Sequence, residues 1–409
     1  MVSWRFCAAS DLKFSFAPGE VPRGFVRVLP SEIYGKERGY GFEPGADVVA
    51  VDRGDGGFVT SDRPFYFSVA LPEGNCNVML TLGDPAGEST TTVKAELRRL
   101  MLQNVHSDFG KLVTRTITVN IRTPAISTGG EVHLKAPREA TTEIWAWDDK
   151  LTLEFNGSRP CLDAMEITPA DVPTMYILGD STVCDQPEEP WNSWGQMITR
   201  FFKPGVAVSN QAESGETADS SLRAHRLDKV LSTMRSGDYL FIEFGHNDMK
   251  EKGPGIGAFT SYKTNLKQFV DGARAKGAIP VLLTSINRKT MDATGHIRNS
   301  LGDYPAAVRE LAAEDNVPLI DLNRLTKTLY EAIGPKNLSE AFVDGTHQDA
   351  YGSYEIAKCV ILGIQQDKLG LTKFIVDDWK PFDPAHPDPF DSVHIPPSPK
   401  WSKIKPRGS

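Results

Sequence analysis

Alternating apolar and polar residues dominate the first ~170 positions of the chain. Apolar side chains occupy every second position over residues 65–71, 117–121 and 151–155, which is the pattern of strands with one face in a core. Turn-forming clusters, such as residues 52–57 and 127–130, separate these stretches. We therefore predict an antiparallel β-sandwich or jelly roll over residues 1–170, with a weakly marked helical interruption at residues 93–100.

The pattern changes near residues 168–173. Short apolar runs then alternate with helical periodicity, and they lie at residues 175–178, 206–208, 239–244, 279–283 and 317–322. One helical stretch contains Tyr262, Leu266, Phe269, Val270 and Ala273, and Gly277 ends it as a C-terminal cap would. A last helix is expected at about 354–366. Five strand–helix units within residues 171–370 predict a parallel sheet covered on both faces.

Residues 371–409 form a third, Pro-rich region with little periodicity, in which eight of 39 residues are proline. Aromatic residues nevertheless recur along it, at Phe374, Trp379, Phe382, Phe390 and Trp401. Because aromatic residues are scarce in disordered chains, we predict an extended segment that packs back on the other domains at least as far as His394. The alternative is a disordered terminus.

Composition narrows the function classes. A chain of 409 residues with 40% hydrophobic and 24% charged residues is ordinary globular material, long enough for two domains. A net charge of −8 without a basic stripe argues against a nucleic-acid partner, and no apolar run is long enough to span a membrane. Residues 1–10 lack the apolar core of a secretory signal, so either the chain is intracellular or a leader has been removed.

The five cysteines are scattered and predict neither a metal site nor a disulfide framework. They are Cys7, Cys76, Cys161, Cys184 and Cys359. Cys184 lies three residues after Ser181, but a small buried hydrophobic residue or one half of a single disulfide explains it better than a nucleophile does.

Four polar islands accompany the apolar runs of the predicted parallel sheet. Three follow a run directly: Gly-Asp-Ser-Thr at 179–182, the stretch 210–217, and Gly-His-Asn-Asp at 245–248. The fourth, Asp-Gly-Thr-His at 344–347, precedes the last helix. Because open α/β sheets place their sites outside the carboxyl ends of the strands, we expect these islands at one edge of the sheet. Taken alone, Gly-Asp-Ser is equally typical of a simple turn.

Together the islands supply what an acyl transfer requires. Ser181 is a candidate nucleophile, His347 a base for its proton, and Asp344 a carboxylate that would fix the tautomer of the base. Backbone N–H groups of Ser181 and Gly215 and the side-chain amide of Asn247 could stabilise an oxyanion. Taken alone, each residue has a simpler interpretation: Asp344 could be a helix cap, and Gly215 could be a turn residue. The set predicts that Ser181 Oγ and His347 Nε2 lie within or near hydrogen-bond reach.

These islands resemble the four blocks of the SGNH (GDSL-type) hydrolases, in which a serine, a glycine, an asparagine and a histidine recur, with an aspartate three residues before the histidine. The resemblance covers residues 173–370. It implies a flavodoxin-like, three-layer α/β/α parallel-sheet domain that needs no cofactor for catalysis. It also implies Ser181, Asp344 and His347 as catalytic residues, and Ser181, Gly215 and Asn247 as the oxyanion hole.

Within this superfamily, Gly-Asp-Ser-Thr-Val and Phe-Gly-His-Asn-Asp resemble the rhamnogalacturonan acetylesterases. The resemblance implies a carbohydrate acetylesterase that removes acetyl groups from plant cell-wall polysaccharide, with pectic rhamnogalacturonan foremost, through an acetyl-enzyme intermediate. Its partner would be an acetylated polysaccharide or oligosaccharide, and its location extracellular or periplasmic. Two residues depart from family patterns: Glu216 stands where arginine is common, and Thr182 stands where lipase-like members have leucine. The alternatives are an acetylesterase of xylan or other glycans, a lipid-like ester hydrolase and a non-catalytic carbohydrate-binding protein.

Other polar and aromatic residues near the islands are weaker candidates. We consider Asp180, His246 and Trp191 as substrate-binding residues; Asp180 could instead steady the serine loop or His347. Trp191 and Trp194 could stack on a sugar, and core packing explains either equally well. The remaining candidates, His225, His296, His386 and His394, show no metal-ligand spacing.

The first domain is similar in predicted architecture to the galactose-binding-like and carbohydrate-binding modules often attached to such esterases. Trp145 and Trp147 alternate in a predicted strand and would share one face, either as a sugar platform or, more simply, within a core. Asp148, Asp149 and residues 52–57 carry oxygen ligands of the kind that calcium takes, although their spacing identifies no site.

Overall fold

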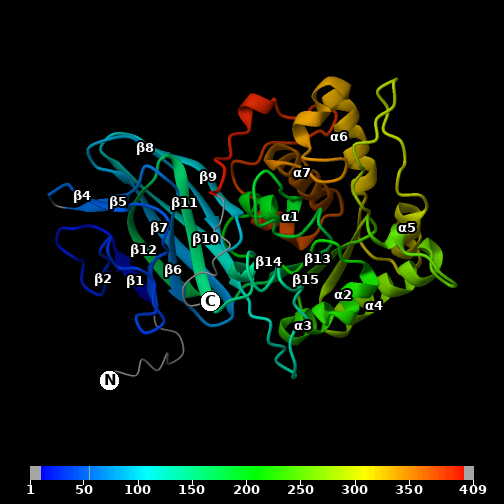
Figure 1. Cartoon of the computed structure of the whole chain (residues 1–409), viewed down its shortest axis with the longest axis horizontal. Coiled ribbons are helices and arrows are strands. Elements are labelled where there is room, and N and C mark those ends of the chain that lie inside the picture. Colours follow the sequence, from blue (N-terminus) through cyan, green and yellow to red (C-terminus); the bar gives the residue numbers. More distant parts are fainter. Residues whose placement is uncertain (1–10, 55, 400–409) are drawn as a thin grey trace.

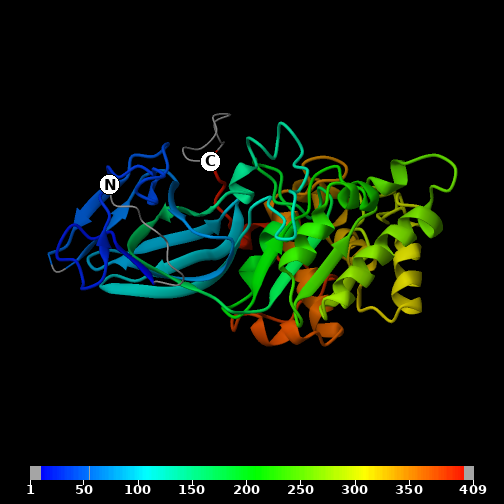
Figure 2. The same ribbon diagram turned by 90° about the horizontal axis from the view of Figure 1, so that it is seen from below.

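The computed structural model describes residues 11–54 and 56–399. Two sheets of mostly antiparallel strands occupy one end of an elongated molecule, and a parallel sheet with its helices occupies the other (Figures 1 and 2). Met1 to Ser10, with Cys7, and Trp401 lie outside the described residues, as does part of the 52–57 cluster.

The two sheets at the first end are built from strands β1 to β12. The larger has the order β10-β7-β12-β1-β2, with β5 on β12 and β4 on β5; the smaller has the order β3-β6-β11-β8-β9. All of these pairs are antiparallel except β1 with β2. The strands are β1 Leu12–Ser15, β2 Val26–Arg27, β3 Tyr40–Phe42, β4 Val49–Asp52, β5 Gly57–Thr60, β6 Phe65–Ala70, β7 Gly74–Asp84, β8 Ser89–Ala95, β9 Arg99–Ser107, β10 Lys111–Ile121, β11 Lys150–Arg159 and β12 Cys161–Pro169.

The two sheets share one hydrophobic core. Phe14, Leu80 and Met165 from the larger sheet cluster with Phe67 and Leu153 from the smaller, as the alternation along β6, β10 and β11 predicts. The second face of β6 is buried as well, because polar partners cover it. The alternation of apolar and polar residues did not indicate this burial. On that face Ser68 Oγ donates to Glu43 Oε1 at 2.7 Å.

Residues 93–100 form a hairpin between β8 and β9, so the helical interruption expected there is wrong. Glu96 and Arg98 adopt positive φ angles of 56° and 64° in the turn between the strands. A helix cannot accommodate such left-handed residues, and the apolar spacing of the stretch gave no sign of them.

Trp145 and Trp147 do not lie in a strand, because residues Ile144–Ala146 form a single 3-10 turn. Both indoles are buried, at 2% and 4% exposure, in a small cluster with Leu97 and Val132. Trp147 Nε1 donates to Glu139 Oε1 at 2.9 Å. Of the two alternatives, burial therefore rules out a sugar platform, and core packing, the simpler one, is confirmed.

The second end contains the parallel sheet, in the order β14-β13-β15-β16-β17. Its strands are β13 Thr174–Gly179, β14 Ala207–Asn210, β15 Tyr239–Glu243, β16 Ile279–Leu283 and β17 Leu319–Ile320. The helices are α1 Trp194–Met197, α2 Ala218–Arg223, α3 Arg226–Thr233, α4 Lys263–Ala275, α5 Tyr304–Glu314, α6 Leu322–Asn337 and α7 Ala350–Gln366. This 2-1-3-4-5 arrangement is a doubly wound order, which carries its ligand site where the order reverses, next to the first strand.

Helices cover both faces of this sheet, as the continuous apolar runs predict. Met175 and Ile177 of β13 join a core with residues of α1, α6 and α7. Tyr176 and Leu178, which point to the opposite face, join a second core with residues of α3, α4 and α5. The first strand, which carries Ser181 at its end, is thus fixed on both sides.

Strand β9 and the turn before it join the two ends of the molecule by packing against α1 and the 3-10 turn Ile198–Phe201 that follows it. Gln196 Nε2 donates to the Leu97 carbonyl oxygen at 3.0 Å, and Thr199 Oγ1 donates to that of Leu100 at 2.7 Å. Arg99, only 1% exposed, donates to the Val208 carbonyl oxygen of β14 at 3.0 Å and to the Asn120 carbonyl oxygen of β10. The buried hydrogen bonds to Leu97, Leu100 and Val208 therefore connect the two regions.

The segment after α7 contacts both ends of the molecule. Short 3-10 turns occur at Gly370–Phe374 and Phe390–Ser392, and Phe382 is buried against the helices around α7. Further along, buried Lys94 of β8 donates to the Pro396 carbonyl oxygen at 2.7 Å and to Ser398 Oγ at 2.8 Å. In Figure 1 this red segment runs from the helical region toward the first two sheets.

Two further expectations concern membrane spans and cysteines. Among the described residues, no helix combines the length and apolar character that crossing a bilayer requires. Cys76, Cys161, Cys184 and Cys359 are buried and unpaired, as expected for small apolar residues.

Candidate active site

The loop after β13 holds Ser181 at the edge of the sheet. Asp180 Oδ1 accepts hydrogen bonds from the Thr182 N–H at 3.0 Å and from Thr182 Oγ1 at 2.9 Å. The N–H groups of Val183 and Cys184 both donate to the Asp180 carbonyl oxygen, which closes the turn. Gln186 Nε2 donates to the Ser181 carbonyl oxygen at 2.7 Å. The serine backbone is therefore held on both sides of its side chain.

Ser181 and His347 lie in direct contact, as expected from the sequence. Ser181 Oγ is 2.8 Å from His347 Nε2, although 166 residues separate them. His347 Nδ1 is 2.7 Å from Asp344 Oδ2. An ionised carboxylate has no proton to donate, so Nδ1 carries the proton and Nε2 can accept the one from the serine hydroxyl.

Asp344 is itself fixed by the backbone. Its Oδ1 accepts hydrogen bonds from the N–H groups of Thr346 at 2.7 Å and His347 at 2.8 Å. Partial burial raises the pKa of Asp344, but the hydrogen bonds from His347 and Thr346 outweigh that effect, and the net pKa lies below its usual value. The carboxylate therefore stays ionised where the imidazole needs it.

Two further predicted residues lie beside the serine, on the loops after β14 and β15. Gly215 has a φ of 76°, which a residue with a side chain rarely adopts. Asn247 Nδ2 donates to the Glu216 carbonyl oxygen at 3.0 Å, and Asn247 Oδ1 accepts from Lys250 Nζ at 2.8 Å. One amide proton of Asn247 remains for a ligand. In the part of the chain described, the backbone N–H groups of Ser181 and Gly215 also donate no hydrogen bond.

A cavity of about 390 Å³ opens over these groups. Ser181, Gly215, Asn247 and His347 all line it. Its volume is within the range of small-ligand sites. The structure thus brings together a hydroxyl, an imidazole, a carboxylate and several N–H donors, which is a set able to transfer an acyl group to serine.

The three predicted substrate-binding residues differ in position. Trp191 lines the cavity with 38% of its surface exposed, so it can meet a ligand. His246 also lines the cavity; burial above all lowers its pKa to about 4, so the ring is neutral. Asp180 is fully buried behind the serine loop and does not line the cavity, so its assignment as a substrate contact is wrong. Trp194 is buried and donates to Glu243 Oε2 at 2.6 Å.

Several cavity residues were missed by the sequence reading. Gln186 and Lys250 stand within five residues of Ser181 and Asn247, in the same loops, so a wider reading of these islands would have found them. Arg138 comes from the segment between β10 and the 3-10 turn at Ile144–Ala146, and no motif marked it. Glu216, the residue that departs from the family pattern, is buried near Arg226 and Lys135, not in the cavity lining.

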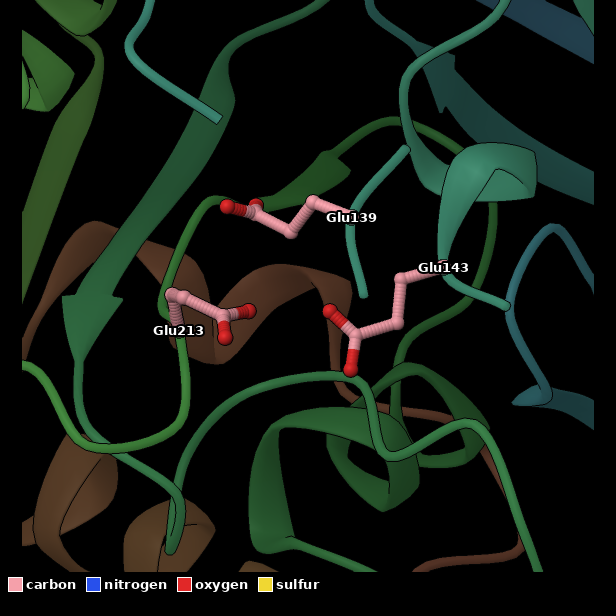
Figure 3. A group of neighbouring side chains, drawn as sticks. All are labelled: Glu139, Glu143 and Glu213. Atoms are coloured by element: carbon pink, nitrogen blue, oxygen red, sulfur yellow. The ribbon is translucent and has the colours of Figure 1, made fainter. Parts of the chain in front are cut away.

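Near this cavity lie three buried carboxylates, Glu139, Glu143 and Glu213, which form the one acidic group among the described residues close enough to hold an ion together. Figure 3 shows Glu143 and Glu213 extending toward one another. Arg138 contacts both, with Nε 2.9 Å from Glu143 Oε1, and Arg226 Nη2 donates to Glu139 Oε2 at 2.6 Å. Guanidinium groups therefore already compensate these charges. None of the three is a residue suggested above as a calcium ligand.

Comparisons with known proteins place this chain among esterases. Residues 177–353 match the model of the GDSL-like lipase/acylhydrolase family. The chain is 39% identical over 219 residues to the rhamnogalacturonan acetylesterase RhgT of Bacillus subtilis, a match that covers 49% of this chain and 94% of that protein. It is 26% identical to the uncharacterized esterase YxiM of the same organism, over 87% of this chain and 91% of that protein.

A crystal structure of YxiM from Bacillus subtilis is also similar, with 24% identity, a TM-score of 0.48, and coverage of 88% of this chain and 99% of that one. The family match includes Ser181, Gly215, Asn247, Asp344 and His347 within its bounds, and the relative at 39% identity is matched over nearly its whole length. The chain accordingly belongs to the GDSL-like lipase/acylhydrolase (SGNH) family, as a member similar to the rhamnogalacturonan acetylesterases, and is an esterase.

Proposed function

We propose that this esterase removes acetyl groups from plant cell-wall polysaccharide, and that pectic rhamnogalacturonan is its substrate. The observation that carries the chemistry is the unbroken contact from Ser181 Oγ through His347 to Asp344 on the wall of a cavity. Support for the substrate is the likeness to RhgT, whose name assigns it to rhamnogalacturonan. A substrate of this kind is found outside the cytoplasm, and we infer an extracellular or periplasmic enzyme.

The first half-reaction transfers the acetyl group to Ser181. As Oγ attacks the acetyl carbonyl carbon, His347 Nε2 takes the hydroxyl proton, and Asp344 stabilises the imidazolium. The carbonyl oxygen becomes an oxyanion that accepts hydrogen bonds from the N–H groups of Ser181, Gly215 and Asn247. Collapse of this intermediate breaks the ester bond, and His347 returns its proton to the departing sugar hydroxyl.

The second half-reaction hydrolyses the acetyl-serine. Water attacks the acetyl carbon while His347 Nε2 takes one of its protons, and the same N–H donors hold the oxyanion. Expulsion of Ser181 Oγ, which regains its proton from His347, releases acetic acid, which ionises to acetate. The protein is regenerated, and its own residues perform each proton transfer.

The remaining regions receive assignments that follow from this proposal. We assign residues 1–170 to a β-sandwich domain of the galactose-binding-like or carbohydrate-binding kind, residues 171–370 to the catalytic domain, and residues 371–409 to a segment that packs back on both. The shared core of the first two sheets supports the sandwich, and the contacts of Lys94 with Pro396 and Ser398 support the last assignment.

Ser181→Ala tests the nucleophile. We expect the variant to lose acetate release from acetylated rhamnogalacturonan and from p-nitrophenyl acetate by about 10³-fold or more, because hydroxide or water must then attack without covalent catalysis. Cys184→Ala is the control: its thiol is 1% exposed, and burial raises its pKa far above the usual range, so activity should persist. Full activity of Ser181→Ala would disprove the mechanism, whereas glycan binding without acetate release by the unaltered protein would favour a carbohydrate-binding role.

The substrate needs its own comparison. Acetate release by the unaltered protein from acetylated rhamnogalacturonan, acetylated xylan and short-chain esters, at equal acetyl concentration, separates the candidate substrates. We expect the highest kcat/KM with rhamnogalacturonan. A higher value with xylan would leave the acyl-transfer mechanism intact and replace the substrate.

A further inference from the structure

The charge of the catalytic cavity is one-sided. Arg138 and Lys250 line it, and none of its other lining residues is an aspartate or a glutamate. His246 adds no charge, because its pKa is lowered to about 4. A cavity lined by cationic side chains attracts anionic ligands. An acetyl ester on a neutral sugar is uncharged and would form no ion pair with these residues.

Arg138 is held in place from below. Its Nε lies 2.9 Å from Glu143 Oε1, and its Nη2 contacts Glu213 Oε1 and donates to the Ser214 carbonyl oxygen at 3.1 Å. Both glutamates are 2% exposed, and Figure 3 shows their carboxyl groups directed toward one another. These contacts use two of the three guanidinium nitrogens. No described residue accepts a hydrogen bond from the third, Nη1, whose N–H groups can donate a charge-assisted hydrogen bond to a ligand carboxylate.

One of the two glutamates beneath Arg138 is not fully ionised at neutral pH. Burial above all raises the pKa of Glu143 to about 7, so this carboxyl is partly protonated under ordinary conditions. The third carboxylate of the group, Glu139, is committed to Arg226 and Trp147. Arg138 thus pairs with Glu213 and with a partly protonated Glu143, while 37% of its side chain is exposed at the cavity wall.

Lys250 provides the second cation from the opposite region of the chain. It is exposed, and its Nζ donates to Asn247 Oδ1 at 2.8 Å, which places the ammonium beside an amide that lines the same cavity as Ser181. Lys250 follows β15 of the parallel sheet, whereas Arg138 precedes the turn between β10 and β11. The cavity is thus completed by a residue from outside the parallel-sheet region.

We propose that Arg138 and Lys250 form a carboxylate-binding subsite for a uronic acid residue of the acetylated glycan. This inference rests on the proposed function and makes it more specific, since it requires an anionic glycan. It also gives Arg138, which comes from outside the parallel-sheet region, a part in substrate selection. Neutral acetylated glycans such as unsubstituted acetylated xylan lack the group that these cations would hold.

The test compares two forms of one substrate with the full chain. O-acetylated rhamnogalacturonan oligosaccharides are used as free acids and after methyl esterification of their carboxyl groups, and kcat/KM for acetate release is measured on each. We expect the unaltered protein to prefer the free acid by about tenfold or more, because charge-assisted hydrogen bonds are lost on esterification. Added salt should reduce that preference.

Variants locate the effect. Arg138→Gln and Lys250→Gln should each move the ratio of free acid to methyl ester toward one. Lys252→Gln is the matched control, because Lys252 is an exposed lysine two residues along that contacts the Met249 carbonyl oxygen and does not line the cavity. Arg138→Gln leaves two buried glutamates without their partner; if it fails to fold, the ratio for the exposed Lys250→Gln decides.

Each outcome has a distinct meaning. Equal rates on the two forms, or an acid preference that survives in Lys250→Gln and in folded Arg138→Gln, would overturn the subsite and leave rhamnogalacturonan as the substrate. No release from either form, with release from acetylated xylan, would overturn both. An acid preference that these variants abolish and Lys252→Gln retains would establish the subsite.

Discussion

Contacts between an aspartate and a histidine three residues apart occur three times among the described residues. Asp344 with His347, His225 with Asp228 and Asp383 with His386 all place Nδ1 within 2.8 Å of a carboxylate oxygen. The pairs differ in what the other ring nitrogen meets: in the first pair alone, Nε2 lies against a serine hydroxyl. The spacing is therefore a poor guide to chemistry by itself, and the serine opposite is what makes one pair a candidate for catalysis.

Asp344→Asn tests this distinction. An asparagine can still hydrogen-bond the ring, but it cannot stabilise an imidazolium and can favour the wrong tautomer. We expect kcat for acetate release to fall by about 10³-fold or more, by analogy with other serine hydrolases, and KM to change little. Stopped assays of acetate production on the purified variant measure both.

Asp383→Asn is the matched control for that change. It alters the same kind of pair in the exposed segment after α7, so it should leave kcat unchanged. If the two variants lost activity equally, the role proposed for Asp344 would be wrong. Because the pKa of Asp344 is lowered, the carboxylate of the unaltered protein remains ionised down to mildly acidic pH.

Residue positions were predictable where they depended on strand ends. Ser181, Asn247 and His347 could be expected together because polar residues beside parallel strands gather at one edge of the sheet. Arg138 could not, since it reaches the cavity through contacts with Glu143 and Glu213 that are long-range or lie within an irregular segment. Nothing in the local pattern around Arg138 distinguishes it from a surface arginine.

Among the elements, β13 shows how a short strand can impose the position of a loop. Gly179 ends the strand, and a Cβ built on it would lie 2.5 Å from the Glu243 carbonyl oxygen and 2.8 Å from Val183 Cγ2. Neither neighbour has room to move, because Glu243 lies in β15 and Val183 is fully buried. A glycine is therefore required by close approach of two backbones, and not by a positive φ.

Gly179→Ala should destabilise the protein through this clash. We expect the free energy of unfolding to fall by about 1–3 kcal/mol, the usual effect of forcing an added carbon into a packed site, and activity to fall with displacement of Ser181. Gly35→Ala is the control, because a Cβ there meets nothing within 4 Å. Denaturant unfolding of the two variants measures the difference, and equal stability would show that the β13–β15 contact yields at no cost.

Elements could be predicted where one hydrophobic period, of a strand or of a helix, persisted, as in β13 to β16 and α4. The predictions failed where the backbone turned within an apolar stretch. The hairpin at residues 93–100 and the turn at Trp145 contain apolar residues at spacings that also suit a helix or a strand. Tertiary contacts determined the structure of these regions: Glu96 and Arg98 adopt left-handed backbone angles, and the indoles are buried against Leu97 and Val132. Such contacts override local propensity.

At the scale of the whole molecule, the segment after α7 ties the two regions together. It packs Phe382 against the helical region and carries Pro396 and Ser398 to Lys94 of β8. Its aromatic content predicted that it packs, because a segment with so many large apolar side chains buries area when it docks. Its path could not be predicted, since the partners of an irregular segment are set by groups such as a buried lysine on a distant strand.

The contact between α7 and this segment contains a carboxyl group with a shifted pKa. Glu355 is fully buried; its Oε2 accepts from the Asp388 N–H at 3.2 Å, and its Oε1 lies 3.2 Å from Lys358 Nζ. Burial raises the pKa of Glu355 to about 7, with Lys358 opposing and the Asp388 carboxylate reinforcing the shift. The folded protein thus keeps a proton on Glu355 that the unfolded chain releases near pH 4.5.

This difference makes stability depend on pH in a defined direction. Between about pH 4.5 and 7 the folded state binds more protons than the unfolded state at this site, so the contribution of Glu355 to the unfolding free energy falls as the pH rises and is constant above pH 7. Glu355→Gln removes the titrating carboxyl group. We expect the decline in unfolding free energy between pH 5 and pH 8 to be smaller in this variant by about 2–3 kcal/mol, as measured by urea unfolding at each pH.

Glu340→Gln is the control, because it alters an exposed glutamate, and it should retain the decline of the unaltered protein. Identical declines in Glu355→Gln and the unaltered protein would mean that Glu355 is ionised when folded, and that its contact with Lys358 outweighs its burial.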